Sequence, residues 1–123
     1  MKKTLTAPDA PRPAGPYSHA VAAGQTVFLA GQVGRNPETG ELPGSFEDQA
    51  RNTLRNLESV ARAAGGSLAD AVRVGVYLRD MANVQAMNEL YVEFVPEPRP
   101  ARTTIQTNIP YEIEIDAVLW VAE

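Results

Sequence analysis

Apolar residues recur at intervals of three and four between positions 46 and 64, which predicts one apolar stripe on a long α-helix. Ser45, with Asp48 three residues later, is a capping-box-like start, although Asp replaces the preferred Glu or Gln. Gly65-Gly66 supplies the C-terminal stop. The stripe consists of Phe46, Ala50, Leu54, Leu57, Ala61 and Ala64.

A period of two marks strands in the second half of the chain. Residues 72–79 and 112–121 alternate apolar and polar side chains, as strands with one buried face do. A second helix is expected from about 83 to 94, followed by a short strand at 103–107. The positions expected to be buried in the two alternating strands are Val72, Val74, Val76, Leu78, Ile113, Ile115, Ala117 and Leu119.

The N-terminal half favours short strands and turns. Residues 3–6 fit a first strand, 7–16 a proline-rich irregular arm, and 17–23 with 27–30 a hairpin. The order of strands, helix, strand, helix and strands predicts an α+β fold in which two helices pack on one face of a mixed β-sheet. We expect one domain over 1–123.

Two helices cannot cover both faces of such a sheet. The second face is then either polar or buried by another copy of the chain. Because Phe28, Tyr77, Val118 and Trp120 are expected on that face, we infer a closed homo-oligomer.

Composition narrows the function. The formal charge of −4 argues mildly against nucleic acid as the main partner. The absence of cysteine excludes disulfides, thiolate metal sites and a cysteine nucleophile. With neither a secretory signal nor an apolar run long enough to span a membrane, the chain is expected to be cytoplasmic.

Standard catalytic motifs are missing. There is no GxxxxGK[ST], GxGxxG, HExxH or GxSxG. His19 is the only histidine, so a histidine-based triad and a multi-histidine metal site are excluded, and we expect no metal. We interpret His19 as a surface or interface residue rather than a general base.

The remaining candidates are an arginine and three carboxylates. Arg102 follows a stiff proline-rich approach and offers a planar fork that matches a carboxylate, although a surface ion pair is the alternative. Glu112, Glu114 and Asp116 share one strand face, so at least one should have a cationic partner or a raised pKa. If the two strands pair, one carboxylate lies near Arg102, where it could position water or move a proton.

Motifs along nearly the whole chain, in order, resemble the reactive-intermediate deaminase family (RidA, also called YjgF). They are Gly15-Pro16-Tyr17-Ser18, Gly31-Gln32, Asn36-Pro37-Glu38-Thr39-Gly40, a helix with Gln49, Asn52, Leu54, Asn56 and Leu57, then Ala63-Ala64-Gly65, Val76-Tyr77-Leu78, Asp80-Met81, Asn88-Glu89-Leu90-Tyr91, Pro100-Ala101-Arg102 and Ile113-Glu114-Ile115-Asp116-Ala117. The resemblance implies a chorismate-mutase-like homotrimer with clefts between subunits. It also implies a cofactor-free 2-iminobutanoate/2-iminopropanoate deaminase, which hydrolyses reactive enamines and imines to 2-keto acids and ammonia.

The resemblance assigns roles by position. Arg102 matches the arginine that binds the substrate carboxylate, and Glu114 matches the acid that positions the attacking water. Tyr17 and Asn88 match pocket residues, and Gly31 lies beside the pocket.

Three departures from the family pattern affect the same pocket. Thr104 stands where many members carry cysteine, at a site that contacts the ligand largely through its backbone. Ala30 replaces a serine common just before Gly-Gln, which removes a hydroxyl from the pocket. The connection between Arg102 and Glu114 is also shorter than usual.

Two other functions remain open. The Ala30 substitution and the short connection keep open a non-catalytic trimer that binds small carboxylates, such as 2-keto acids, and has a regulatory role. An endoribonuclease activity has also been attached to this family, but the acidic charge and single histidine make it the least favoured.

Overall fold

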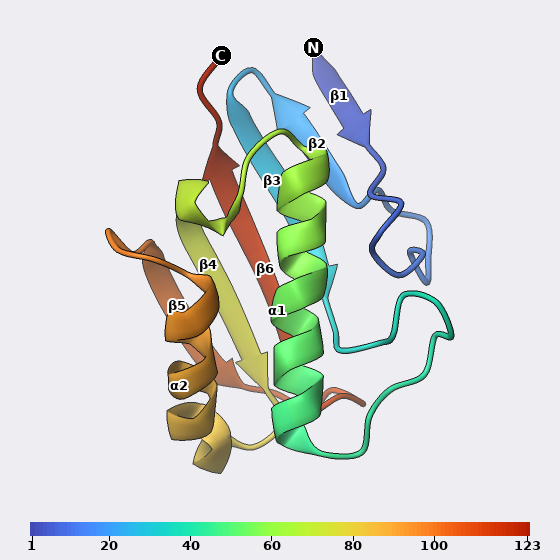
Figure 1. Ribbon diagram of the computed structural model, residues 1–123, viewed down its shortest axis with the longest axis vertical. Coiled ribbons are helices and arrows are strands. Elements are labelled where there is room, and N and C mark those ends of the chain that lie inside the picture. Colours follow the sequence, from blue (N-terminus) through green and yellow to red (C-terminus); the bar gives the residue numbers. More distant parts are fainter.

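The computed structural model describes residues 1–123 and contains one six-stranded mixed sheet with two helices on the same face (Figure 1). This confirms the predicted α+β layer. The sheet order is β1-β2-β3-β6-β4-β5, and only the β4–β5 pair is parallel. The elements are β1 (Lys2–Leu5), β2 (Ala20–Ala23), β3 (Thr26–Gln32), α1 (Phe46–Ala63), β4 (Ala71–Leu78), α2 (Val84–Phe94), β5 (Ala101–Gln106) and β6 (Ile113–Trp120), with 3-10 turns η1 (Leu68–Asp70) and η2 (Met81–Asn83).

Helix α1 follows its sequence pattern closely. The Ser45 hydroxyl accepts a hydrogen bond from the Asp48 N–H at 3.1 Å, which caps the first turn. Leu54 and Leu57 are fully buried against the sheet. Gly65 takes a φ of 88°, a left-handed conformation that ends the helix at little steric cost. Neither helix is both long and apolar enough to cross a membrane.

Strands β4 and β6 supply the middle of the core. In β6 the predicted alternation holds from Ile113 to Leu119, with every apolar position of the pattern buried. In β4 the pattern fails at its first position, because Val72 is 51% exposed. The register between β4 and β6 shifts between Ala71 and Arg73, and this irregularity turns Val72 away from the core.

The sheet face opposite the helices is not covered by another element, and several apolar side chains lie on it (Figure 1). Phe28 and Trp120 are each 50% exposed, and the register of β3 on β6 aligns Phe28 with Val118. Tyr77 lies on the same face, opposite Ile105 of β5. The prediction that Phe28, Tyr77, Val118 and Trp120 lie on the uncovered face is therefore confirmed.

Strand order separates the two segments that the sequence treated as possible neighbours. Strand β5 pairs only with β4, and β6 pairs with β3 and β4. Because β4 lies between them, the carboxylates of β6 and the arginine of β5 are not on adjacent strands. The sequence placed a carboxylate near Arg102 only if these two strands pair, and that condition is not met.

Candidate functional site

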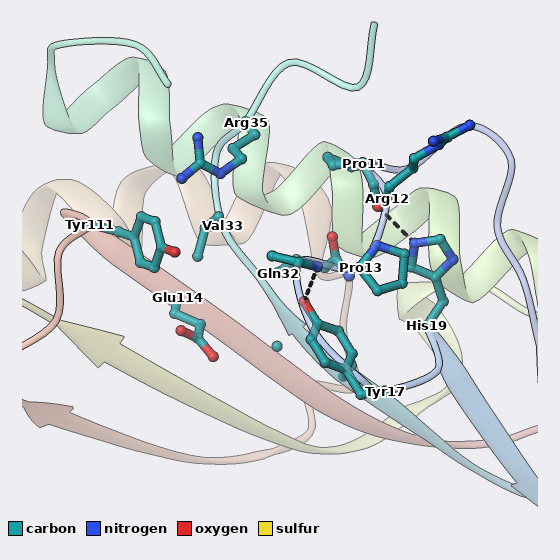
Figure 2. A pocket seen from close by; sticks show the side chains of 13 residues that line it. Pro11, Arg12, Pro13, Tyr17, His19, Gln32, Val33, Arg35, Tyr111 and Glu114 are labelled. Atoms are coloured by element: carbon teal, nitrogen blue, oxygen red, sulfur yellow. Dashed lines mark hydrogen bonds between the residues drawn. The ribbon is translucent and has the colours of Figure 1, made fainter. Parts of the chain in front are cut away.

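A cavity of about 310 Å³ opens between the N-terminal arm, the end of β3, the loop after β3 and the start of β6 (Figure 2). Four of the predicted site residues line it: Tyr17, Ala30, Gly31 and Glu114. Its volume lies within the range of small-molecule sites. Segments far apart in the sequence therefore meet at one concave surface.

Glu114 is the only carboxylate in the lining of this cavity. It alternates with the buried Ile113 and Ile115, so its side chain points away from the helices. Burial raises the pKa of the Glu114 carboxyl, and the negative charge of Asp116 raises that pKa further. A larger fraction of Glu114 is therefore protonated at a given pH than for an exposed glutamate.

Gly31 makes room for this carboxyl group. A Cβ at position 31 would lie 3.0 Å from the Glu114 carboxyl carbon and would overlap Oε2. Any larger residue at position 31 must displace the carboxylate. In the sequence, only the resemblance to the deaminase family indicated a role for Gly31. The structure gives a steric reason for a glycine at this position.

The three carboxylates predicted to repel one another are accommodated differently. Glu112 forms an ion pair with Arg79. Asp116 accepts a hydrogen bond from the Tyr77 hydroxyl at 2.9 Å, and this bond is the main cause of the raised pKa of Tyr77. Glu114 has neither kind of partner, and its pKa is raised. The prediction that at least one of the three carboxylates has a cationic partner or a raised pKa is therefore confirmed, by Glu112 and by Glu114.

Buried polar side chains of α1 hold the walls of the cavity. Asn56 donates from Nδ2 to the carbonyls of Val33 and Arg35, both at 2.9 Å. Gln49 donates to the Pro43 carbonyl at 2.7 Å and accepts from the Glu112 N–H at 2.9 Å. These residues flank the apolar stripe of α1. Their hydrogen bonds to segments distant in the sequence could not be predicted from the spacing of apolar residues in the helix.

His19 anchors the N-terminal arm. Its Nδ1 accepts from the Ala7 N–H at 2.9 Å, and its Nε2 donates to the Pro11 carbonyl at 2.7 Å. This pattern requires a neutral ring with the proton on Nε2. His19 is 4% exposed, so the expectation of a surface or interface residue is wrong: the arm folds over the ring.

Tyr17 lies at the mouth of the cavity. It is 49% exposed, and its hydroxyl accepts a hydrogen bond from the Ala14 N–H at 3.1 Å. The ring and the arm therefore hold each other, as Figure 2 shows.

Arg102, Thr104 and Asn88 lie outside this cavity, Arg102 and Thr104 on the edge strand β5 and Asn88 on α2. Arg102 aligns with the buried Val74, and its guanidinium lies 4.8 Å from the centroid of the Tyr91 ring of α2. Asn88 is exposed one helical turn before Tyr91. The hydroxyls of Thr104 and Tyr91 are buried without a hydrogen-bond partner, and burial raises the pKa of Tyr91.

The two groups cannot meet within one copy of the chain. Arg102 points to the helix-covered face of the sheet, whereas Glu114 points to the other face two strands away. A substrate that touches both side chains must therefore lie between two copies of the chain.

The cavity also contains residues that the sequence did not indicate. Arg35 and Tyr111 lie together at one end, with the guanidinium 5.5 Å from the ring centroid (Figure 2). Arg12 belongs to the arm, and its side chain extends away from the cavity. Position 111 lies in the short connection before β6, where Asn108-Ile109-Pro110-Tyr111 stands in place of the basic or glycine residues common in the family, and the sequence assigned Tyr111 no role. No group of three or more His, Asp or Glu side chains is arranged to hold a metal ion.

Comparison with known proteins gives consistent similarities. The family model described as Endoribonuclease L-PSP matches residues 7–121. A RutC family protein of Pyrococcus horikoshii is 42% identical and covers 98% of both chains. A 2-iminobutanoate/2-iminopropanoate deaminase of Dermatophagoides farinae is 39% identical over 85% of this chain and 82% of its own. The crystal structure of RidA from the Antarctic bacterium Psychrobacter superposes with a TM-score of 0.94, at 38% identity over 97% of this chain and 99% of that one.

Proposed function

The chain belongs to the RidA/YjgF family, and on that premise we propose that it hydrolyses reactive imines and enamines, such as 2-iminobutanoate and 2-iminopropanoate, to 2-keto acids and ammonia. The family includes proteins named as reactive intermediate deaminases. The observation that carries the proposal is the Glu114 carboxyl group. It lies in a cavity, its pKa is raised, and it has no ion-pair partner.

The proposal requires a second copy of the chain. Arg102 and Glu114 lie on opposite faces of one sheet, so we propose that a homotrimer brings Arg102 of one subunit to the cavity of its neighbour. The exposed apolar face that carries Phe28 and Trp120 supports assembly, because monomers rarely expose a broad apolar surface. Thr104 and Asn88 would then reach the substrate from the same subunit as Arg102.

The proposed reaction needs no covalent enzyme intermediate. Arg102 holds the substrate carboxylate through paired N–H donors and so orients the C=N carbon. Water attacks that carbon while Glu114 accepts one of its protons, and the imine nitrogen takes up a proton from solvent. Glu114 then returns its proton to the nitrogen of the carbinolamine and ammonia leaves. The carbinolamine hydroxyl gives its proton to solvent as the C=O bond of the 2-keto acid forms.

The environment of Glu114 suits this cycle. Its raised pKa brings the carboxyl group closer to the pH at which it must both accept and return a proton. Tyr17 closes the mouth of the cavity, and Ala30 and Gly31 leave the space beside the carboxyl for a small substrate.

A coupled assay tests the activity. A threonine dehydratase generates 2-aminocrotonate, and 2-ketobutyrate formation is followed with and without this protein. We expect acceleration by the native chain and a loss of about tenfold to 100-fold in Arg102→Ala. Arg99→Ala is the matched control, because Arg99 pairs with Glu97 and the Val95 carbonyl in the same segment.

An unaccelerated reaction would contradict the deaminase proposal for this substrate. Titration of the same protein with 2-ketobutyrate then separates the alternatives. Binding that Arg102→Ala removes would favour the non-catalytic carboxylate binder.

A further inference from the structure

Arg35 is a cation in the cavity that the proposed reaction does not use. Its guanidinium and Glu114 belong to the same cavity lining. The ion pairs of the chain use Arg51, Arg62, Arg79 and Arg99, so Arg35 has no carboxylate at ion-pair distance.

The position of Arg35 is well defined by its surroundings. Its backbone carbonyl accepts a hydrogen bond from the buried Asn56 at 2.9 Å. Its Nη1 donates to the Gly40 carbonyl at 3.1 Å, and its guanidinium lies over the Tyr111 ring. Only one of the several N–H donors of the guanidinium is used in this way. The remaining donors are available to an anion at a fixed place.

This cation is distinct from the arginine of the proposed reaction. Arg102 lies on the opposite face of the sheet and would reach the cavity from another subunit to hold the carboxylate beside the C=N carbon. Arg35 lies with Tyr111 at one end of the cavity, while Tyr17 closes another part of it (Figure 2). A substrate that uses the two arginines separately, one at each end, carries two acidic groups.

We infer that Arg35 is a specificity-determining residue that binds a second, distal carboxylate, so that the preferred substrates are imino acids with an acidic side chain. This inference rests on the proposed function for the reaction and adds the substrate class. The lining favours such a ligand, because Glu114 is its only carboxylate and the raised pKa of Glu114 reduces the negative charge that would oppose a second anion. The same chemistry applies to the corresponding dicarboxylic 2-keto acids.

The kinetic test compares two imines with equal carbon chains. D-Aspartate oxidase forms the imine of D-glutamate, and D-amino-acid oxidase forms the imine of D-norvaline; semicarbazide traps what remains of each. The native protein is expected to act about tenfold more efficiently, in kcat/KM, on the imine of glutamate. Arg35→Gln removes this preference and leaves the imine of norvaline within about twofold, whereas Arg35→Lys retains most of it.

A binding test separates this inference from the proposed reaction. Calorimetric titration compares 2-oxoglutarate with 2-oxopentanoate, and the native protein is expected to bind 2-oxoglutarate about tenfold more tightly, with the preference lost in Arg35→Gln. If neither imine is hydrolysed faster but this preference holds, the deaminase proposal fails and the role of Arg35 stands. If both imines are hydrolysed and the native protein shows no preference in either test, the inference about Arg35 is overturned. An equal loss for both imines in Arg35→Gln also overturns it, because that result indicates a role only in holding the loop.

Discussion

The two halves of the proposed site lie on different strands, Glu114 on the central strand β6 and Arg102 on the edge strand β5, and they differ in kind. The Glu114 half is a cavity whose walls are held by buried polar groups of α1 and by His19 under the arm. The Arg102 half consists of the edge strand β5 and the helix α2, which meet at Arg102 and Tyr91, and it contains two buried hydroxyls without partners. One half supplies a shaped space and a proton carrier, and the other supplies a charge. Under the proposed mechanism, neither half is sufficient for the reaction by itself.

The largest effect is expected where the two halves are brought together. Trp120→Asp places a charge on the exposed apolar face, and we expect loss of assembly by light scattering together with loss of imine hydrolysis. Ala86→Asp is the control, since Ala86 is exposed on α2, in the helical layer on the opposite side of the sheet (Figure 1). Full activity of a monomeric Trp120→Asp protein would show that one copy contains a complete site.

Glu114→Gln tests the cavity half alone. It keeps the size of the side chain and removes its proton-carrying function, so we expect a loss of about 100-fold or more in kcat/KM. Glu112→Gln serves as the control, because Glu112 pairs with Arg79 rather than facing the cavity.

The stability of the same variant gives an independent reading. Folding raises the pKa of the Glu114 carboxyl. The free energy of unfolding of the protein therefore falls as the pH rises from the usual pKa of a glutamate through the raised value. Glu114→Gln should therefore be at least as resistant to thermal unfolding as the native chain near neutral pH. A less stable variant at that pH would mean that the ionised carboxylate stabilises the fold.

Gly31→Ala probes the space around the carboxyl. The added methyl group overlaps Glu114 and must move it, so we expect a loss of about tenfold in kcat/KM without loss of assembly. Gly44→Ala is a suitable control, because a Cβ there meets no atom within 4 Å. Unchanged activity in Gly31→Ala would mean that the position of the Glu114 carboxyl is not critical.

Asp116→Asn is expected to have the smallest effect. The charge of Asp116 raises the pKa of Glu114, so its removal lowers that pKa and moves the acid limb of the pH–rate profile to lower pH. The shift is partial, because burial is the larger cause. An asparagine oxygen can still accept from the Tyr77 hydroxyl, which limits other changes. An acid limb that stays in place or moves to higher pH would contradict this role.

The local pattern of apolar and polar residues predicted the helices and strands better than it predicted which strands pair with one another. The alternation in β6 placed Glu114 and Asp116 on the face away from the core. The stripe of α1 located Ala50, Leu54, Leu57 and Ala61, which are four of the eight buried positions of that helix. The bulge that exposes Val72 depends on how β4 aligns with β6, which no local spacing records. For the same reason, the sequence allowed β5 to pair with β6, although β4 lies between them.

The candidate site was predictable from the sequence where a residue matched a family motif with a known role. Resemblance indicated Arg102, Glu114, Tyr17 and Gly31, and the structure places the last three at the cavity and Arg102 on the edge strand β5. It did not indicate the hydrogen bonds of His19, which go to backbone atoms of the arm, nor the stacking of Arg35 on Tyr111. Those contacts join segments that only the folded chain brings together.

Subunit mixing tests most directly whether two copies build one site. Arg102→Ala and Glu114→Gln are each expected to assemble but hydrolyse 2-aminocrotonate poorly. When equal amounts are unfolded and reassembled together, random mixing gives about one quarter of the native number of intact sites, if Arg102 and Glu114 come from different subunits. Recovery near that fraction of the native rate is the predicted result. A mixture that assembles yet remains as inactive as its two components would contradict the account.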